Sequence, residues 1–196
     1  MPEDYFRRAA WEEVFPDYDG GPVEVDLGSG DGTFLATMAA GMPGHRFLGV
    51  ERLLGRVRAC CRKVREAGAL DRARVLRLES LYTVRWLLPL ASVQRLHLLF
   101  PDPWPKKKHH QRRIFSESFL GDVAQVLKPG GEVLFKTDDA DYAEWARERV
   151  PSGCPWTHLP WQEGDFFYPT TDFEARWLAQ GRAIHRLRLR FEGGAA

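Results

Sequence analysis

The sequence predicts an α/β domain in which helices cover a mainly parallel β-sheet. Segments typical of buried strands alternate with segments of helical periodicity through the first 150 residues. A glycine-rich turn, Gly28–Gly32, separates the first strand from the first helix, as in open sheets that bind ligands at the carboxyl ends of their strands. The length of 196 residues and the apolar content of 44% suit one domain over 1–196, with 1–21 as a short N-terminal extension.

The first two strand–helix pairs are the easiest to recognise. Residues 22–27 form a short apolar run that predicts a buried strand, and 33–40 carry apolar residues at helical spacing. Residues 46–51 predict a second strand. Residues 53–67 predict a helix whose polar face is strongly basic. The two strands are expected to lie parallel, because a helix connects them.

The middle of the chain repeats this pattern. Strands are expected at 74–78 and 95–100, separated by a helical stretch over 82–88. Residues 113–127 predict a long helix, because apolar residues recur at every third or fourth position. The helix is expected to stop at Lys128–Gly131, where a proline is followed by two glycines.

The pattern changes after residue 150. A fifth strand is expected at 132–137 and a helix at 140–149, but 151–160 contains three prolines and is interpreted as a loop. A helix is expected over 171–181. Residues 184–191 alternate leucine and arginine, which predicts a final strand with one polar face.

Charge is strongly segregated along the chain. The net charge is only +1, yet residues 52–113 contain 16 basic and 4 acidic side chains, a net charge of +12. A surface with this charge attracts polyanions. Solvated helix faces would explain the same composition, so charge by itself does not decide for nucleic acid.

Several other classes of protein are disfavoured. No apolar run approaches the roughly 18 residues of a membrane span, and the acidic N-terminal residues are unlike a secretory signal, so a cytoplasmic location is expected. Cys60, Cys61 and Cys154 form no Cys-x-x-Cys pair, so we expect no disulfide framework, and no cluster of metal ligands is found. Monomer and homodimer both remain open.

The glycine turn has features of a site for a cationic ligand. Gly28 and Gly30 allow the backbone to approach a ligand closely. A dinucleotide fingerprint would place its third glycine at Thr33, and Asp26 is a poor neighbour for a pyrophosphate. S-adenosylmethionine carries a sulfonium and an ammonium group and no phosphate, so it suits this turn. The alternative is an ordinary strand–helix connection.

Two further acids follow the next strands. Glu51 ends the second strand, where a carboxylate can accept both ribose hydroxyls of a nucleoside. Glu79 follows the third strand and is a candidate for the adenine end, although a solvated loop acid is an equally good interpretation.

A rigid segment follows the fourth strand. Pro101–Pro105 contains three prolines in five residues, which restrict the backbone and prevent helix formation. Trp104 can stack on a base, and Asp102 can form hydrogen bonds with it. The next eight residues carry five formal positive charges and no acid, so we expect Arg112 and Arg113 to contact phosphates.

These motifs together resemble the bacterial tRNA (guanine-N7-)-methyltransferases from about residue 22 to about residue 178. The glycine turn alone is common to many methyltransferases, whereas the Asp-Pro-Trp-Pro-Lys run and the Thr-x-Phe-Glu-x-Arg run are specific. The resemblance rests on five segments: Asp26–Gly32, Phe47–Glu51, Phe100–Arg113, Lys136–Asp138 and Thr171–Arg176.

The resemblance implies a Rossmann-like class I methyltransferase fold, with a seven-stranded, mostly parallel sheet, an antiparallel last strand and helices on both faces. It also implies that S-adenosylmethionine methylates N7 of guanine 46 in the tRNA variable loop. The donor contacts that it implies are Asp26, Glu51, Glu79 and Asp102. The substrate contacts that it implies are Lys106, Asp138, Thr171, Asp172, Phe173 and Glu174.

The proposed chemistry defines a role for Asp102. Guanine N7 carries a lone pair and no proton, so the reaction needs no general base and depends on positioning and electrostatics. We therefore expect Asp102 to orient the reactants, with Asp138 and Glu174 as alternative readers of the guanine edge. Two alternatives remain: an amino-methyltransferase acting on adenine or cytosine, and an RNA-binding protein without catalytic activity.

Overall fold

The computed structural model describes residues 6–151, 155–162 and 164–193, and its centre is one seven-stranded sheet. The strand order is β3-β2-β1-β4-β5-β7-β6. The first five strands in this order run parallel to one another, whereas β7 is antiparallel to both β5 and β6. The strands are β1 (Val23–Leu27), β2 (Arg46–Val50), β3 (Ala73–Leu76), β4 (Val93–Leu99), β5 (Leu127–Thr137), β6 (Trp156–Leu159) and β7 (His185–Phe191).

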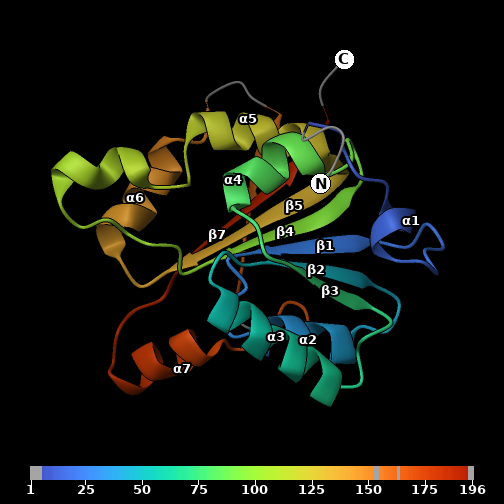
Figure 1. Ribbon diagram of the computed structural model, residues 1–196. Coiled ribbons are helices and arrows are strands. Elements are labelled where there is room, and N and C mark those ends of the chain that lie inside the picture. The colour runs from blue at the N-terminus through green and yellow to red at the C-terminus, as the bar shows by residue number, and fades with distance from the viewer. Residues whose placement is uncertain (1–5, 152–154, 163, 194–196) are drawn as a thin grey trace.

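Helices cover both faces of this sheet (Figure 1). On one face lie α4 (Ser80–Tyr82), α5 (Glu117–Val126) and α6 (Ala140–Glu148). On the other lie α2 (Thr33–Gly41), α3 (Leu54–Glu66) and α7 (Asp172–Ala179). The expected fold class is confirmed, including the antiparallel seventh strand.

The two faces differ in chemistry. Alternate residues of a strand point to opposite faces, so Val23, Val25 and Leu27 of β1 join the large apolar core under α5 and α6. Glu24 and Asp26 point the other way and are also buried. The sheet therefore has one apolar face and one face on which several charged residues are buried.

Three local predictions were wrong. The helix expected over 113–127 begins only at Glu117, where the Ser116 hydroxyl caps it by accepting from the amide of Phe119. The fifth strand begins at Leu127 rather than at 132, because Leu127 already pairs with Val93 of β4. The register then shifts before Glu132 pairs with Arg95. The loop expected over 151–160 contains β6, which pairs along β7.

The N-terminal extension is fastened to the body of the protein. It contains a short helix, α1 (Trp11–Val14), that was not expected. The Arg8 guanidinium donates to the carbonyl oxygens of Leu88 at 2.6 Å and Arg85 at 2.8 Å. These carbonyls lie at the C-terminal end of the π-helical turn η1 (Thr83–Leu87), where no following turn donates to them. Arg8 thus caps that turn from outside.

Candidate active site

The glycine turn closes tightly onto the end of β2. The amides of Gly28 and Ser29 both donate to the Val50 carbonyl, at 2.8 and 3.0 Å. Gly28 has φ +78° and Gly30 has φ +56°, backbone conformations that glycine adopts without strain. A side chain at Gly32 would collide with Cys60 of α3. Glycine is therefore needed here both for the path of the turn and for the approach of α3.

Glu51, the residue after β2, binds the backbone of this turn. Its side chain is buried, and its carboxylate accepts from the amide of Gly30 at 3.2 Å and from that of Leu53 at 2.7 Å. The acid at the end of β2 and the glycine turn therefore form one unit. This contact is the geometry expected where a backbone turn and a carboxylate receive a nucleoside together.

Asp26 lies at the base of the same turn with a free acceptor. It is 3% exposed, and its Oδ2 atom has no hydrogen-bond partner among the described residues. Burial, with a smaller contribution from the negative charge of Glu51, raises the pKa of Asp26 to about 7. An unpartnered buried carboxylate fits a cationic ligand, because such a ligand supplies the charge that the protein lacks.

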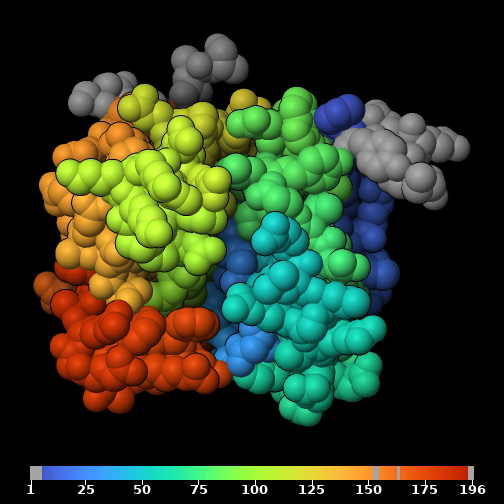
Figure 2. All heavy atoms as spheres, turned by 60° about the vertical axis from the view of Figure 1, so that its left-hand side comes forward, coloured from blue at the N-terminus to red at the C-terminus, as the bar shows by residue number. Residues whose placement is uncertain are grey.

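The turn lies in a hollow at the edge where the parallel strands end. Figure 2 shows the hollow between the yellow-green segment that follows β4 and the cyan atoms of α3, with blue atoms of the β1 region on its floor. α7, in red, adjoins this edge from below. This is the place where open α/β sheets bind ligands.

Glu79 has a local structural role. It is exposed and forms the N-cap of α4, where its carboxylate accepts from the amides of Leu81 at 3.0 Å and Tyr82 at 2.7 Å. Both oxygens therefore already have partners in the chain. Its expected contact with the donor stays a prediction.

Asp102 stands out from the end of β4 on a constrained backbone. The residues two before and two after it, Phe100 and Trp104, have φ values of +51° and +47°. Left-handed backbone at such bulky residues is rare and is characteristic of functional sites. Asp102 is exposed and forms no hydrogen bond or ion pair with any residue that the structure describes. Its carboxylate is thus held out toward solvent and available to a ligand.

The basic run after Pro105 has an exposed part and a buried part. Lys106 and Arg112 are exposed, and the Arg112 guanidinium lies 5.0 Å from the centre of the Trp104 ring. The Arg113 side chain is completely buried. It donates to the Pro103 carbonyl at 2.7 Å and to Asp141 at 2.5 Å. The structure contradicts the expected phosphate contact of Arg113, which instead fixes the proline segment against α6.

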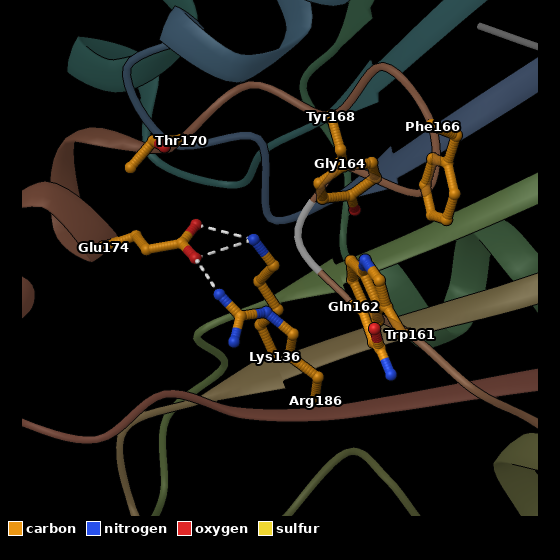
Figure 3. Close-up of a pocket in the computed structure, with 9 residues that line it drawn as sticks. All are labelled: Lys136, Trp161, Gln162, Gly164, Phe166, Tyr168, Thr170, Glu174 and Arg186. Atoms are coloured by element: carbon orange, nitrogen blue, oxygen red, sulfur yellow. Dashed lines mark hydrogen bonds and ion pairs between the residues drawn. The ribbon is translucent and has the colours of Figure 1, made fainter.

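Glu174 is also an anchor rather than an open reader of a base. Both of its carboxylate oxygens bind Lys136 of β5, at 2.8 and 2.7 Å, and Arg186 of β7 lies 3.3 Å away (Figure 3). The pair is buried, and one side of it faces a small pocket whose aromatic wall includes Trp161 and Tyr168. The expected role of Glu174 as a guanine reader is not supported by this arrangement. Its carboxylate ties α7 to the sheet.

The other substrate residues expected around α7 surround its N-terminus. The Thr171 hydroxyl caps the helix by accepting from the amide of Glu174 at 3.0 Å. Asp172 accepts from the Thr33 hydroxyl at 3.2 Å, so α7 touches the glycine turn. Phe173 is 49% exposed, which is unusual for its size. Asp138, at the end of β5, pairs with Arg182 at 3.0 Å.

The sequence does not reveal a buried polar network on the charged face of the sheet. Glu24 accepts from His45 and His97, at 2.8 and 2.7 Å, and the other ring nitrogen of His97 bonds the Tyr168 hydroxyl at 2.8 Å. His97 is fully buried, and both of its ring nitrogens have partners. Strand alternation places Glu24 on the same face as Asp26, and that alternation was the available signal.

The described residues contain neither a candidate metal site nor a candidate membrane span. No group of three or more histidine, cysteine or acidic side chains could hold a metal ion within residues 6–151, 155–162 and 164–193. In the same part of the chain, no helix has the length and apolar character needed to cross a membrane.

Comparison with known proteins identifies relatives over most of the chain. Residues 20–187 match the family model described as a putative methyltransferase. The chain is 40% identical over 173 residues to a tRNA (guanine-N(7)-)-methyltransferase of Halorhodospira halophila, covering 85% of this chain and 73% of the relative. It is 35% identical over 181 residues to the enzyme of that name from Treponema pallidum, covering 90% and 70%.

Solved structures support the fold. The 16S rRNA methyltransferase KamB superimposes with a TM-score of 0.62 at 19% identity, covering 92% of this chain and 91% of that one. TrmN from Thermus thermophilus gives a TM-score of 0.60 at 17% identity, covering 92% of this chain and 46% of that one. At these identities, the likeness concerns the arrangement of the sheet and its helices.

Proposed function

The chain belongs to the family of tRNA (guanine-N(7)-)-methyltransferases, and we propose that it transfers a methyl group from S-adenosylmethionine to N7 of guanine 46 in the variable loop of tRNA. One observation carries this proposal beyond the family name. The unpartnered, buried carboxylate of Asp26 lies at the base of a glycine turn, and the free carboxylate of Asp102 stands at the same strand edge.

Asp26, Glu51 and the glycine turn form the proposed donor site. The donor supplies an electrophilic methyl group on a positively charged sulfur. Asp26 offers the negative charge that favours a cation, and Glu51 offers carboxylate oxygens for the ribose hydroxyls. Gly28 presents no side chain, and an added Cβ there would meet only open space, so a ligand can lie directly against the backbone.

Asp102 is the proposed catalytic residue. Because guanine N7 has no proton to lose, the Asp102 carboxylate is not needed as a general base, and its proposed role is to orient the guanine. It can accept from the N1–H and the exocyclic amine of guanine. The left-handed backbone at Phe100 and Trp104 keeps it in place. A reacting nitrogen and carbon must lie about 3–3.5 Å apart and in line, so loss of this constraint reduces the rate even where binding survives.

The RNA backbone is proposed to bind across both rims of the hollow. Lys106 and Arg112 are exposed on one rim. Exposed arginines of the α3 region form the other: Arg52, Arg56, Arg58, Arg62 and Arg65. Cations on both sides of a cleft suit a polyanion that enters it. The half-exposed ring of Phe173 is available to stack on a base. Because the proposed substrate is tRNA, the proposed location is the cytoplasm.

Methyl transfer to tRNA, followed by nucleoside analysis, tests the function. Unmodified tRNA transcripts are incubated with the full chain and S-adenosylmethionine, and a transcript with adenine at position 46 is the control. We expect 7-methylguanosine from the first and none from the second. Methyladenosine or methylcytidine as the product would indicate the amino-methyltransferase alternative. Absence of any methylated product would overturn the proposal.

A further inference from the structure

Lys63 connects three segments that the proposed function treats separately. It lies on α3, and its ammonium group donates to Asp31 in the glycine turn, called the donor turn below, and to the hydroxyl of Thr33, the first residue of α2. The same ammonium group lies 3.7 Å from the carboxylate of Asp172, at the start of α7. The Thr33 hydroxyl also donates to Asp172 at 3.2 Å. The donor turn, α3 and α7 therefore meet at one cation.

This contact is the second of two that hold the N-terminus of α7. The first is the buried carboxylate of Glu174, which Lys136 and Arg186 hold against the sheet. The second lies two residues earlier, at Asp172, and fastens the helix to the donor turn. Thr171 and Phe173, two of the substrate residues that the family resemblance implies, flank Asp172. The position of these residues thus depends on a contact with the donor turn.

The second contact depends on the charge of Lys63. Asp31 and Asp172 are two carboxylates near one another, and both approach the Lys63 ammonium within 4 Å. Partial burial acts to raise the pKa of Asp31, but hydrogen bonds from the Lys63 ammonium group and the Thr33 amide outweigh it and lower the pKa to about 2. Without Lys63, like charges would face each other across the contact and the start of α7 would be pushed away from the turn.

We propose that Lys63 is a positioning residue that couples donor binding to RNA binding by latching α7 onto the donor turn; this rests on the proposed function. A donor that orders the turn also orders Asp31 and Thr33, and through them Asp172. The RNA then meets an α7 that is already in place and loses less conformational entropy on binding. The coupling is positive, and it is reciprocal by thermodynamic necessity.

The test measures this coupling directly in the full chain. The dissociation constant of a tRNA transcript is determined with and without saturating S-adenosylhomocysteine, and that of S-adenosylhomocysteine with and without tRNA. In the unmodified protein, we expect each ligand to lower the dissociation constant of the other by about fivefold or more. In Lys63→Met the factor should fall to within about twofold of unity, whereas Lys63→Arg should retain most of it.

A matched control lies one residue earlier. Arg62 is on the same helix and carries the same charge, but its side chain is mostly exposed and pairs only loosely with Glu66, at 4.0 Å. Arg62→Met should weaken RNA binding through loss of charge and leave the coupling factor unchanged. The two variants should also differ in kinetics. Lys63→Met should raise the KM for tRNA measured at saturating donor much more than it lowers kcat.

Hydrogen exchange provides a measurement that requires no RNA. Amides of α7 should exchange faster in Lys63→Met than in the unmodified chain, while those of β5 and β7 should not change. Thr33→Val removes the hydroxyl that contacts Lys63 and Asp172, so it can replace Lys63→Met in this test if that variant does not fold. Unchanged α7 exchange, or full coupling in Lys63→Met, would overturn the latch. If the chain makes no 7-methylguanosine, the proposed function fails, and the exchange measurement still decides on the latch.

Discussion

A buried, unpartnered carboxylate at Asp26 should lower the stability of the fold and favour binding of a cationic donor. Replacing Asp26 with asparagine separates these two effects. In the folded protein the pKa of Asp26 rises from the ordinary 3.8 to about 7, because of burial and the charge of Glu51. The native state therefore keeps its proton between about pH 4 and pH 7, where the unfolded chain has lost it. The native state binds more protons in this window, so its stability falls as the pH rises through it.

The magnitude follows from the two pKa values. Each pKa unit corresponds to about 1.4 kcal/mol, so an ionised Asp26 destabilises the fold by roughly 4 kcal/mol at pH 8. At pH 5 the same calculation gives only roughly 1.5 kcal/mol. Asparagine has nearly the same shape and no charge. The stability of Asp26→Asn relative to the unmodified chain should therefore increase by roughly 2–3 kcal/mol between pH 5 and pH 8.

Urea unfolding of the ligand-free chain at pH 5 and pH 8 measures this difference in stability. The substitution should have the opposite effect on donor binding, which it should weaken. Asp26→Asn should be the more stable protein at pH 8 and the weaker binder of S-adenosylhomocysteine or S-adenosylmethionine. Near pH 7 the unmodified chain should release part of a proton when the donor binds, which calorimetry in buffers of different ionisation enthalpy detects. A stability difference that is equal at pH 5 and pH 8 would refute the reasoning.

Four further substitutions test the site. Asp102→Ala should lower turnover at least about a hundredfold while the unfolding temperature is unchanged, because its carboxylate is exposed and has no partner among the residues that the structure describes; near-normal turnover would exclude the proposed role. Arg112→Ala should weaken tRNA binding and reduce its salt dependence, whereas Arg113→Ala should leave the salt dependence intact and cost about 1–3 kcal/mol of stability in urea unfolding. Lys136→Met should cost about 3–5 kcal/mol, because it leaves the buried Glu174 with less compensating charge; a variant as stable as the unmodified chain would contradict the anchor.

The sequence is informative where a residue's role follows from its neighbours in the chain. Five of the strands could be located from apolar runs, and the seventh from the alternation of leucine and arginine. The chemistry of the donor turn was also accessible. The residue types of Asp26 and Glu51, at the ends of two adjacent parallel strands, are enough to bring both acids to one edge.

Roles that depend on the direction of a side chain were not accessible. Arg112 and Arg113 are adjacent and identical in type, yet one is exposed and the other completely buried. The difference arises because Arg113 lies in extended backbone between a 3₁₀ turn (Lys107–Arg112) and α5, rather than in the helix expected from residue 113. In this position its side chain reaches Pro103 and Asp141. The sequence likewise gives no sign that Glu174 pairs with Lys136, because the two residues are 38 positions apart in the chain.

The division of the sheet into an apolar and a charged face explains how the site is held. The apolar face, with the core under α5 and α6, provides most of the burial that stabilises the fold. Buried charges on the other face contribute less to stability than apolar residues would, because each must be desolvated. They do, however, fix the orientations of the side chains that they bind. Glu24 accepts hydrogen bonds from His45 and His97, and His97 forms a hydrogen bond with the Tyr168 hydroxyl. Asp26, two residues further along β1, is a buried carboxylate with an oxygen that has no partner among the described residues, so this oxygen is available for a cation.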